Sequence, residues 1–462
     1  MRGLLILGIP FGLIFLKHQP EQRMGIDRRA FLKQAAATGA GVSVLGLGRA
    51  FGSPGSRLIT AVMGVNSRGH VLAQSFAKAD NCEVVYVCDV DARAIARTIE
   101  GVKEVAPEAS PKGEVDVRRV LEDNDVDLLV IAAPDHWHAP ATIMAAQAGK
   151  HVYVEKPCSY NAGEGEMLVA AQQRYNRVIQ MGNQQRSSVE SAQIVQAIHE
   201  GIIGRAYYAR AWYANTRGSI GRGSPVPVPE WLNYDLWQGP APRIPFKDNY
   251  IHYNWHWFLH WGTGEICNNG AHEIDIARWA LGVDFPTRVV SAGGRFHFDD
   301  DWEFFDTQVA TFNFEGGKAI TWDGKSCNGR PSEGRGRGTS VHGEYGTVII
   351  DRDGYVVYDR DNKEIWKRSR ASGQEATLDI RGGGGLTDRH IANFLAVIRD
   401  DAEQASPIDE GHKSTLLCHL GNIAQLTGRS LQCDPANGHI MGDEEAMAYW
   451  NRTYEPGWEL EV

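Results

Sequence analysis

The sequence lacks several features that would assign the protein to common classes. Its seven cysteines are an odd number, and no two of them stand at C-x-x-C spacing. Neither a disulfide framework nor a zinc site is therefore indicated. The net charge of −10 is spread without long acidic or basic runs. Because binding to a phosphate backbone needs a basic face, we expect no nucleic-acid partner.

The N-terminal region lacks an apolar run long enough to span a bilayer comfortably. The run in residues 4–16, LLILGIPFGLIFL, holds a proline and falls short of the ~20 residues that a spanning helix needs. Further on, Arg28 and Arg29 precede Phe31, Leu32 and a weakly apolar stretch that ends near residue 48. This pattern resembles a twin-arginine export signal.

From this signal we expect export of the folded protein to the periplasm, without stable membrane association once the signal is processed. We interpret Met24 as the true start and residues 1–23 as a mis-assigned extension. A membrane anchor is the alternative interpretation of that segment.

The length and the amino-acid composition of the chain indicate a two-domain globular protein. A chain of 462 residues can bury two sizeable cores. Its 51 glycines predict tight backbone approaches and long loops. Its 13 tryptophans favour a flat-faced ligand such as a sugar, although many of them would simply pack in the core.

Short apolar strands alternate with helical stretches in the first half of the chain. The strands are expected at residues 58–65, 82–90, 127–134, 151–157 and 177–183. Helical stretches are expected at residues 69–79, 139–150 and 163–175. Buried strands that alternate with such helices predict an α/β fold with a parallel, doubly wound Rossmann sheet.

After Asn183 the pattern changes to that of an α+β domain. Helices are expected at residues 191–201, 271–281, 388–400 and 412–428, and successive strands between residues 205 and 359. Hairpin signals between these strands favour a mostly antiparallel, open sheet. We divide the chain into an extension and signal (1–56), an NAD(P)-binding domain (57–183), a substrate and oligomerisation domain (184–432) and a tail (433–462).

The first strand leads into GVNSRG, residues 64–69, and then into a helix. That is the context of a dinucleotide fingerprint, in which Gly64 permits a tight turn and Gly69 lets the helix pack closely. Asn66 replaces the middle glycine, so the pattern alone is weak. We expect the cofactor to be bound by Gly64, Asn66, Ser67, Arg68 and Gly69.

An acidic residue ends the second strand. Asp89 stands twenty residues after Gly69, where a carboxylate accepts hydrogen bonds from the adenosine ribose of NAD. The alternative role, capping the next helix, better suits Asp91. Arg93 is near enough to bind a 2′-phosphate, so the cofactor is NAD or NADP.

Two later strands end in polar residues that should face the same crevice, because ligands bind at the carboxyl ends of strands in such sheets. Pro134, Asp135 and His138 follow one strand, and Glu155 and Lys156 end the next. An ammonium at this place can hydrogen-bond a substrate hydroxyl and stabilise alkoxide charge. Pro157 would hold the backbone, with a cis peptide as one form.

With these motifs the chain resembles the Gfo/Idh/MocA oxidoreductase family, named for glucose-fructose oxidoreductase and inositol dehydrogenase. The resemblance runs from Leu58 to Gly428 and is carried by GVNSRG, CDVD, PDHWHA, VEKP and NNGAHEIDIARWALG. It implies that Lys156 is catalytic. The family's Asp-x-x-x-His pair falls on Asn268 and His272, with His272 as general base. It also implies a homodimer or homotetramer associated through the antiparallel sheets.

Between the domains, His252, His256 and His260 stand four residues apart. On a helix they would share one face, as metal ligands do, but no acidic ligand is interleaved and aromatic residues surround each of them. We favour a sugar-binding wall over a metal site or plain packing. The expected substrate contacts are Trp212, Tyr253, His256, Trp257, His260, Asn268 and His272. Trp231 and Trp237 could belong to the same wall.

The sequence thus predicts an exported, NAD(P)-dependent oxidoreductase that acts on a secondary hydroxyl of a sugar or glycoside. One alternative is glycoside hydrolysis or elimination through transient oxidation. Another is a non-catalytic sugar-binding protein with a structural dinucleotide. Export would require a tightly held cofactor, for which the glycine-rich residues 330–338 are a candidate lid.

Overall fold

The computed structural model of the chain describes residues 57–369 and 385–462. The expected export signal, with Arg28 and Arg29, lies outside these residues. Within the two described ranges, no helix combines the length and the apolarity that crossing a membrane requires.

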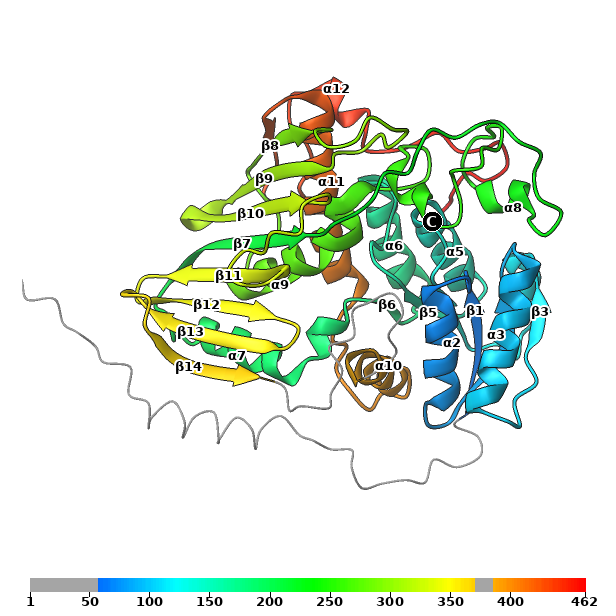
Figure 1. Cartoon of the computed structure of the whole chain (residues 1–462). Helices are drawn as coiled ribbons and strands as arrows, with labels where there is room; N and C mark the ends of the chain where they lie inside the picture. Colours follow the sequence, from blue (N-terminus) through cyan, green and yellow to red (C-terminus); the bar gives the residue numbers. More distant parts are fainter. Residues whose placement is uncertain (1–56, 370–384) are drawn as a thin grey trace, which may run out of the picture. The chain divides into compact units, whose positions relative to one another are not determined.

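The first sheet is parallel and doubly wound, as the sequence predicts (Figure 1). Its strand order is β3-β2-β1-β4-β5-β6. The strands are β1 (Leu58–Met63), β2 (Cys82–Cys88), β3 (Lys112–Glu114), β4 (Leu128–Ile131), β5 (His151–Val154) and β6 (Ile179–Met181). The helices are α2 (Arg68–Lys78), α3 (Ala92–Val105), α4 (Val117–Leu121), α5 (Asp135–Gln147) and α6 (Ala162–Tyr175). The order reverses between β1 and β4, which creates a crevice at their carboxyl ends.

Both faces of this sheet are completed by segments from the end of the chain. Helix α10 (Gly385–Ile398) packs Ile391, Phe394 and Leu395 onto the core formed with β1, β2 and α2. On the opposite face, Trp458 and Val462 pack against the core that α5 and α6 share. The last residues of the tail, from Trp458 to Val462, therefore pack with the dinucleotide-binding half.

The second sheet has nine strands in the order β14-β13-β12-β11-β7-β10-β9-β8-β15 (Figure 1). All neighbouring pairs are antiparallel except β7 and β10. The strands are β7 (Ala206–Ala214), β8 (Arg288–Gly294), β9 (Thr307–Phe314), β10 (Lys318–Lys325), β11 (Arg337–Gly343), β12 (Gly346–Asp351), β13 (Gly354–Asp359), β14 (Glu364–Ser369) and β15 (Leu431–Gln432). Helices α7 (Val189–His199), α9 (Ala271–Leu281) and α11 (Ile408–Thr427) pack against it.

The segment that follows β7 is mostly irregular but has its own aromatic core. It contains α8 (Tyr234–Gln238) and a 3₁₀ turn at Asn254–Trp257. A separate short helix, α12 (Glu444–Met447), lies near the end of the chain. Edge-to-face contacts join Trp261 to Trp237 and to Tyr250, with ring centroids 4.9 and 4.6 Å apart. Such packing holds a long loop in one shape.

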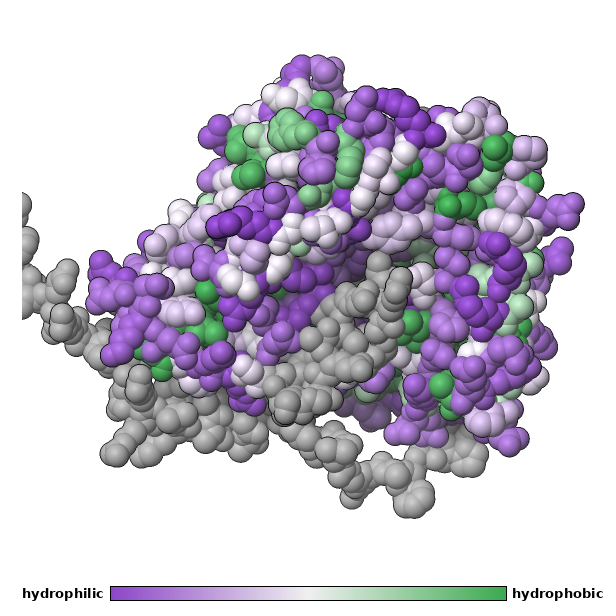
Figure 2. All heavy atoms as spheres, viewed as in Figure 1, coloured by the Kyte–Doolittle hydropathy of each residue, from purple (hydrophilic) through white to green (hydrophobic). Residues whose placement is uncertain are grey.

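The face seen in Figure 2 is mainly hydrophilic where its residues are described, with apolar residues in small scattered groups. Broad apolar patches usually mark interaction surfaces. The face in this view therefore presents no broad apolar interaction surface among its described residues.

Candidate active site

A cavity of about 500 Å³ lies where the carboxyl ends of β1, β2, β4 and β5 meet residues that follow β7. Of the residues predicted from the sequence, it is lined by Gly64, Asn66, Ser67, Arg68, Asp89, Pro134, Asp135, His138, Glu155, Lys156, Tyr253, His256, Asn268 and His272. The structure thus brings together residues that lie up to about 200 positions apart in the chain. A cavity of this size can hold a small molecule.

The turn after β1 has the backbone that a dinucleotide requires. Gly64 has a φ of +80°, and a Cβ there would lie 2.3 Å from the Ala133 nitrogen. A Cβ on Gly69 would lie 2.1 Å from the Gly64 oxygen, so Gly69 serves close helix packing and does not line the cavity. Ser67 caps α2 without a side-chain hydrogen bond, which leaves main-chain N–H groups for a phosphate. These residues fit the pyrophosphate of a dinucleotide.

Asp89 holds this turn in place from the end of β2. Its carboxylate accepts hydrogen bonds from the main-chain nitrogens of Val65 (2.6 Å) and Asp91 (2.9 Å). Burial raises its pKa, and these two hydrogen bonds oppose that effect. Asp89 borders the cavity at the place where a ribose is expected.

Asp91 caps α3, as the sequence predicts, by accepting from the Arg93 nitrogen at 2.9 Å. The Arg93 side chain also donates hydrogen bonds to the Asp91 carboxylate, through Nε at 3.0 Å and through Nη2 at 2.9 Å. Its guanidinium also lies 3.4 Å from the ring centroid of Trp231. The Arg93 guanidinium therefore already has partners within the protein, namely the Asp91 carboxylate and the Trp231 ring.

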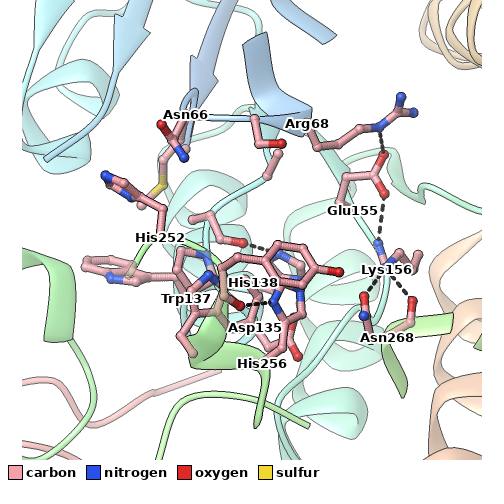
Figure 3. A pocket seen from close by; sticks show the side chains of 18 of the residues that line it. Asn66, Arg68, Asp135, Trp137, His138, Glu155, Lys156, His252, His256 and Asn268 are labelled. Atoms are coloured by element: carbon pink, nitrogen blue, oxygen red, sulfur yellow. Dashed lines mark hydrogen bonds and ion pairs between the residues drawn. The ribbon is translucent and has the colours of Figure 1, made fainter. Parts of the chain in front are cut away.

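Lys156 points into the cavity from the end of β5 (Figure 3). Its Nζ donates to the main-chain oxygen of Asn268 at 2.6 Å and to the Asn268 side-chain oxygen at 3.1 Å. Burial lowers the pKa of Lys156, and the carboxylates of Glu155 and Asp135 oppose this effect. The following Lys156–Pro157 peptide is cis, as the sequence suggested. An ammonium with a lowered pKa suits proton transfer.

The negative charge of the adjacent Glu155 is balanced by the cation Arg68. Its carboxylate accepts from Arg68 Nε at 2.9 Å and from Gln184 Nε2 at 2.9 Å. Burial would raise the pKa of Glu155, but Arg68 and Lys156 hold it below its usual value. Glu155 therefore links the turn after β1 to the start of the second half.

Two further residues from the end of β4 have separate roles. Asp135 accepts a hydrogen bond from Thr263, and burial raises its pKa to about 6. His138 has its ring nitrogens 2.6 Å from the Pro157 oxygen and 2.7 Å from the Ala133 oxygen. His138 thus ties two strand ends together, whereas Asp135 influences Lys156 electrostatically.

His272 lies in the first turn of α9, directly after a π-helical turn at Ile266–Gly270. It is 7% exposed and borders the cavity. Burial lowers its pKa well below the usual value, and the cations Arg352, Lys156 and Arg337 lower it further. The imidazole is consequently neutral at neutral pH and can accept a proton from a hydroxyl.

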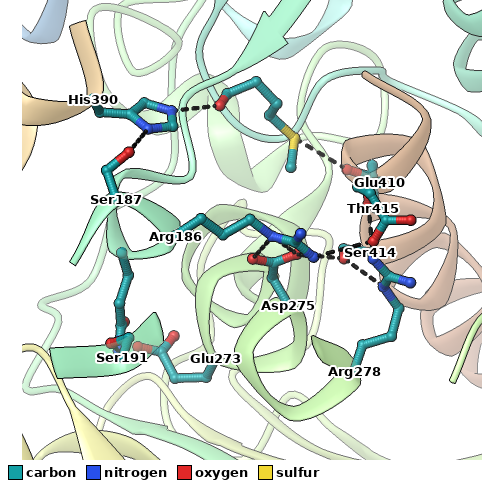
Figure 4. A network of polar contacts seen from close by, with 12 residues as sticks. Arg186, Ser187, Ser191, Glu273, Asp275, Arg278, His390, Glu410, Ser414 and Thr415 are labelled. Carbon is teal, nitrogen blue, oxygen red and sulfur yellow. Dashed lines mark hydrogen bonds and ion pairs between the residues drawn. The ribbon is translucent and has the colours of Figure 1, made fainter. Parts of the chain in front are cut away.

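A buried polar network holds α9 in position (Figure 4). Asp275, one turn after His272, accepts from Arg186 Nε at 2.8 Å and from Ser414 Oγ at 2.6 Å. Arg278 donates to Ser414 Oγ at 2.9 Å and also pairs with Glu410. Through Arg186 this network connects α9 and α11 to the segment after β6.

The histidine-rich segment does not have the helical arrangement in which its three histidines would act together as metal ligands. Only Asn254–Trp257 forms a helical turn, so His252, His256 and His260 do not share a helical face. In residues 57–369 and 385–462, no group of His, Cys, Asp or Glu is arranged to hold a metal ion.

The three histidines contact different groups. His256 Nδ1 lies 2.6 Å from the Tyr253 oxygen, and both residues border the cavity. His252 also borders it and contacts Asp91. His260, a predicted substrate contact, lies outside the cavity lining, and its Nε2 is 2.7 Å from the Pro242 oxygen.

Trp212 and Trp257 also lie outside the cavity lining, contrary to the prediction. Trp212 is fully buried beside β11 and donates to the Arg335 oxygen at 3.0 Å. Trp257 stacks on Trp302, with ring centroids 4.0 Å apart. Composition cannot distinguish a core tryptophan from a ligand-binding one. Tryptophans that do line the cavity are Trp137, Trp237 and Trp255.

Sequence reasoning missed several polar residues of the cavity wall. Arg217 donates to Glu265 at 2.6 Å and to the Tyr253 hydroxyl at 3.0 Å. Arg337 donates to Glu273 at 2.7 Å, and it is the part of the glycine-rich stretch 330–338 that reaches the cavity. The sequence carried no local signal for these pairs, because their partners lie far along the chain. The missed wall residues include Gln184, Tyr213, Asn215, Arg217, Asn269 and Arg337.

Comparison with known families agrees with this geometry. A model described as "Oxidoreductase family, NAD-binding Rossmann fold" matches residues 58–183. A model described as "Oxidoreductase family, C-terminal alpha/beta domain" matches residues 206–350. Together the two matches span more than half of the chain.

Individual proteins resemble the chain more distantly. A "Glycosyl hydrolase family 109 protein" of Saccharopolyspora erythraea is 29% identical over 48% of this chain and 55% of its own length. The chain thus aligns with only about half the length of this relative.

Solved structures share the fold. Levoglucosan dehydrogenase in complex with NADH and levoglucosan has a TM-score of 0.61 at 19% identity, covering 81% of this chain and 99% of that one. The WlbA dehydrogenase of Bordetella pertussis, in complex with NADH and UDP-GlcNAcA, has a TM-score of 0.59 at 19% identity, covering 82% and 99%.

Proposed function

Because the chain belongs to the Gfo/Idh/MocA oxidoreductase family, whose first domain binds NAD, we propose that it oxidises or reduces a secondary hydroxyl of a sugar or glycoside. The observation that carries the proposal is that one cavity is lined by Lys156, by its hydrogen-bond partner Asn268 and by a neutral His272, whose pKa Lys156 helps to lower. Polar and aromatic residues share this wall, which suits a sugar ring.

In the oxidation direction, His272 accepts the proton of the substrate hydroxyl. Lys156 donates a hydrogen bond to the same oxygen and stabilises the developing negative charge. Asn268 orients the ammonium through its two oxygens. The nicotinamide, when bound, supplies hydride chemistry at the carbinol carbon. Tyr253 and His256 border the same space and would orient the sugar.

The preferred cofactor is NAD rather than NADP. A 2′-phosphate would meet the carboxylate of Asp89, which borders the cavity where the ribose is expected. Arg93, the cation that could offset this charge, is paired with Asp91 and stacked on Trp231. Repulsion between like charges in this setting disfavours the phosphate.

Absorbance at 340 nm during a single turnover tests the proposal. Purified protein with NAD is mixed with a panel of sugars and glycosides, and a dehydrogenase accumulates NADH with at least one of them. A sugar-binding protein without catalysis gives no absorbance change with any sugar, and that result would overturn the proposal.

A second candidate is redox-neutral cleavage of a glycoside, in which a sugar is transiently oxidised, the aglycone is eliminated, water adds to the unsaturated sugar, and the hydride returns from the reduced cofactor to the sugar. The family name of the Saccharopolyspora erythraea relative supports this candidate. The same experiment separates the two, because a hydrolase releases product without net NADH. The Glu155-Lys156-Pro157 motif, in which the family resemblance implies a catalytic lysine, favours simple oxidation.

We also propose that the protein is exported by the twin-arginine route and works as a homodimer or homotetramer. The first proposal rests on Arg28 and Arg29 in their sequence context, and the second on the family resemblance. Cell fractionation of the wild type and of a variant with both arginines replaced by lysine tests export. Light scattering during size-exclusion chromatography tests the oligomer.

A further inference from the structure

The loop that contains Trp231 is joined to the turn after β2 by main-chain hydrogen bonds. The Ala92 nitrogen donates to the Trp231 oxygen at 3.1 Å, and the Asn233 nitrogen donates to the Val90 oxygen at 2.9 Å. Asp91 and Leu232 form an isolated antiparallel bridge between them. A segment of the second half is thus paired with the dinucleotide-binding half like a short strand.

Side chains lock the same junction. His252 Nε2 lies 2.8 Å from the Asp91 carboxylate, which is 1% exposed and also holds Arg93. Arg93 stacks on Trp231, and the rings of Trp231 and His252 lie 5.7 Å apart. These contacts form a closed cycle of four residues: Asp91, Arg93, Trp231 and His252.

This junction lies over the part of the cavity where the adenosine half of NAD is expected. Asp89 and Val90 border the cavity from the turn after β2. His252, Leu236 and Trp237 border it from the opposing loop. Trp237 is only 4% exposed and packs on Trp261, so the opposing wall has a rigid base.

We propose that residues 231–252 act as a clamp that closes over the adenosine half of NAD and retains the cofactor between turnovers. The inference rests on the NAD-binding role of the first domain. Release of the dinucleotide would require the two main-chain hydrogen bonds and the side-chain cycle to open together. The glycine-rich stretch 330–338 is not this clamp, because it is packed onto Trp212 and paired with Asp351.

A retained cofactor has a measurable residence time. At association rate constants of about 10⁵–10⁷ M⁻¹ s⁻¹, a residence time of hours corresponds to a nanomolar dissociation constant or tighter. Such an enzyme would carry one NAD per chain through purification without added nucleotide.

The test uses the full chain purified without added nucleotide, then denatured so that released NAD can be assayed. Wild type should contain about one NAD per chain. Dissociation of bound NADH, followed by its fluorescence after addition of excess NAD, should be at least about tenfold faster in His252→Ala and Arg93→Gln. Arg93 is largely exposed, with 56% of its side-chain surface accessible, so Arg93→Gln should fold normally.

Arg205→Gln is the matched control, because Arg205 is an exposed arginine that pairs with Glu344 and lies near the Tyr207 ring, away from the cavity. It should release NADH at the wild-type rate. Wild-type protein that is empty after purification, or clamp variants that release NADH at the wild-type rate, would overturn the inference. If NAD is retained but no hydride is transferred between the cofactor and any sugar, the proposed function is contradicted while the clamp inference is still supported.

Discussion

The ammonium of Lys156 lies 2.6 Å from the main-chain oxygen of Asn268 and 3.1 Å from its side-chain oxygen. Both acceptors are neutral, although Glu155 is adjacent in the chain. The π-helical turn at Ile266–Gly270 contains Asn268 and places its carbonyl toward the cavity. Lys156 is therefore held by hydrogen bonds rather than by a direct ion pair.

Replacing Lys156 by alanine should lower turnover by about 10²–10⁴-fold, as expected for loss of a positioned proton-transfer or oxyanion-stabilising group. NAD binding should change far less, since the turn at 64–69 is untouched. Steady-state kinetics and NADH fluorescence titration measure the two effects. Lys103→Ala, at an exposed pair with Glu100, is the control. Turnover within tenfold of wild type would remove Lys156 from the mechanism.

Replacing Asn268 by aspartate should raise the pKa of Lys156, because a carboxylate beside an ammonium favours the charged form. The alkaline limb of the pH–rate profile should move to higher pH by about 1–3 units. Asn268→Ala removes the side-chain hydrogen bond without adding charge, so its alkaline limb should not move upward. An identical alkaline limb in Asn268→Asp and wild type would show that Lys156 does not set it.

Replacing Asp89 by alanine should weaken NAD binding by about 1.5–3 kcal/mol, as for loss of hydrogen bonds to a charged group. NADP should lose less affinity or gain some, because a negative charge near its 2′-phosphate disappears. Calorimetric titration with both cofactors measures the difference. Equal losses for both would mean that Asp89 acts only by holding the Val65 nitrogen and not at the ribose.

Two buried histidines should make stability fall in mild acid. Burial lowers the pKa of His390 and of His412 to about 4 each. Unfolded histidine titrates near pH 6.5. As pH falls from about 6.5 to 4, the unfolded state takes up these protons and the folded state does not, so the free energy of unfolding drops. The slope is about 1.4 kcal/mol per pH unit for each histidine.

Urea unfolding at pH 7.5, 6 and 5 measures this slope. Well above pH 6.5, both histidines are neutral in the folded and the unfolded state and contribute no pH dependence. His412→Gln should have a shallower slope than wild type by about one histidine's share. A slope unchanged by this substitution would assign the acid sensitivity to other groups.

Local patterns in the sequence were enough to predict the parallel sheet and the residues at its strand ends. Gly64, Asp89 and Lys156 each follow a strand whose continuous apolar run marks it as buried, and the carboxyl ends of parallel strands meet at one edge. Strand β3 was missed because its three residues, Lys112–Glu114, are polar and lie at the sheet edge.

Tertiary structure decided which of the aromatic and charged residues reach the cavity. Trp237 and Trp255 border the cavity whereas Trp212 and Trp257 do not, although all four are buried and lie in similarly aromatic sequence. The difference depends on which distant elements pack on each ring.

The contacts of the clamp, residues 231–252, could not be predicted from the sequence either, because they join residues far apart in the chain. His252 and Asp91 are 161 positions apart, and their contact needs both halves of the molecule to be folded. Periodicity along the chain reports which face of a helix or strand is buried. It carries no information about which loops meet, because that depends on how separately folded layers pack. By itself the sequence therefore determined the family, the Rossmann sheet and the position of Lys156 at a strand end, and the fold decided how the cavity around them is closed.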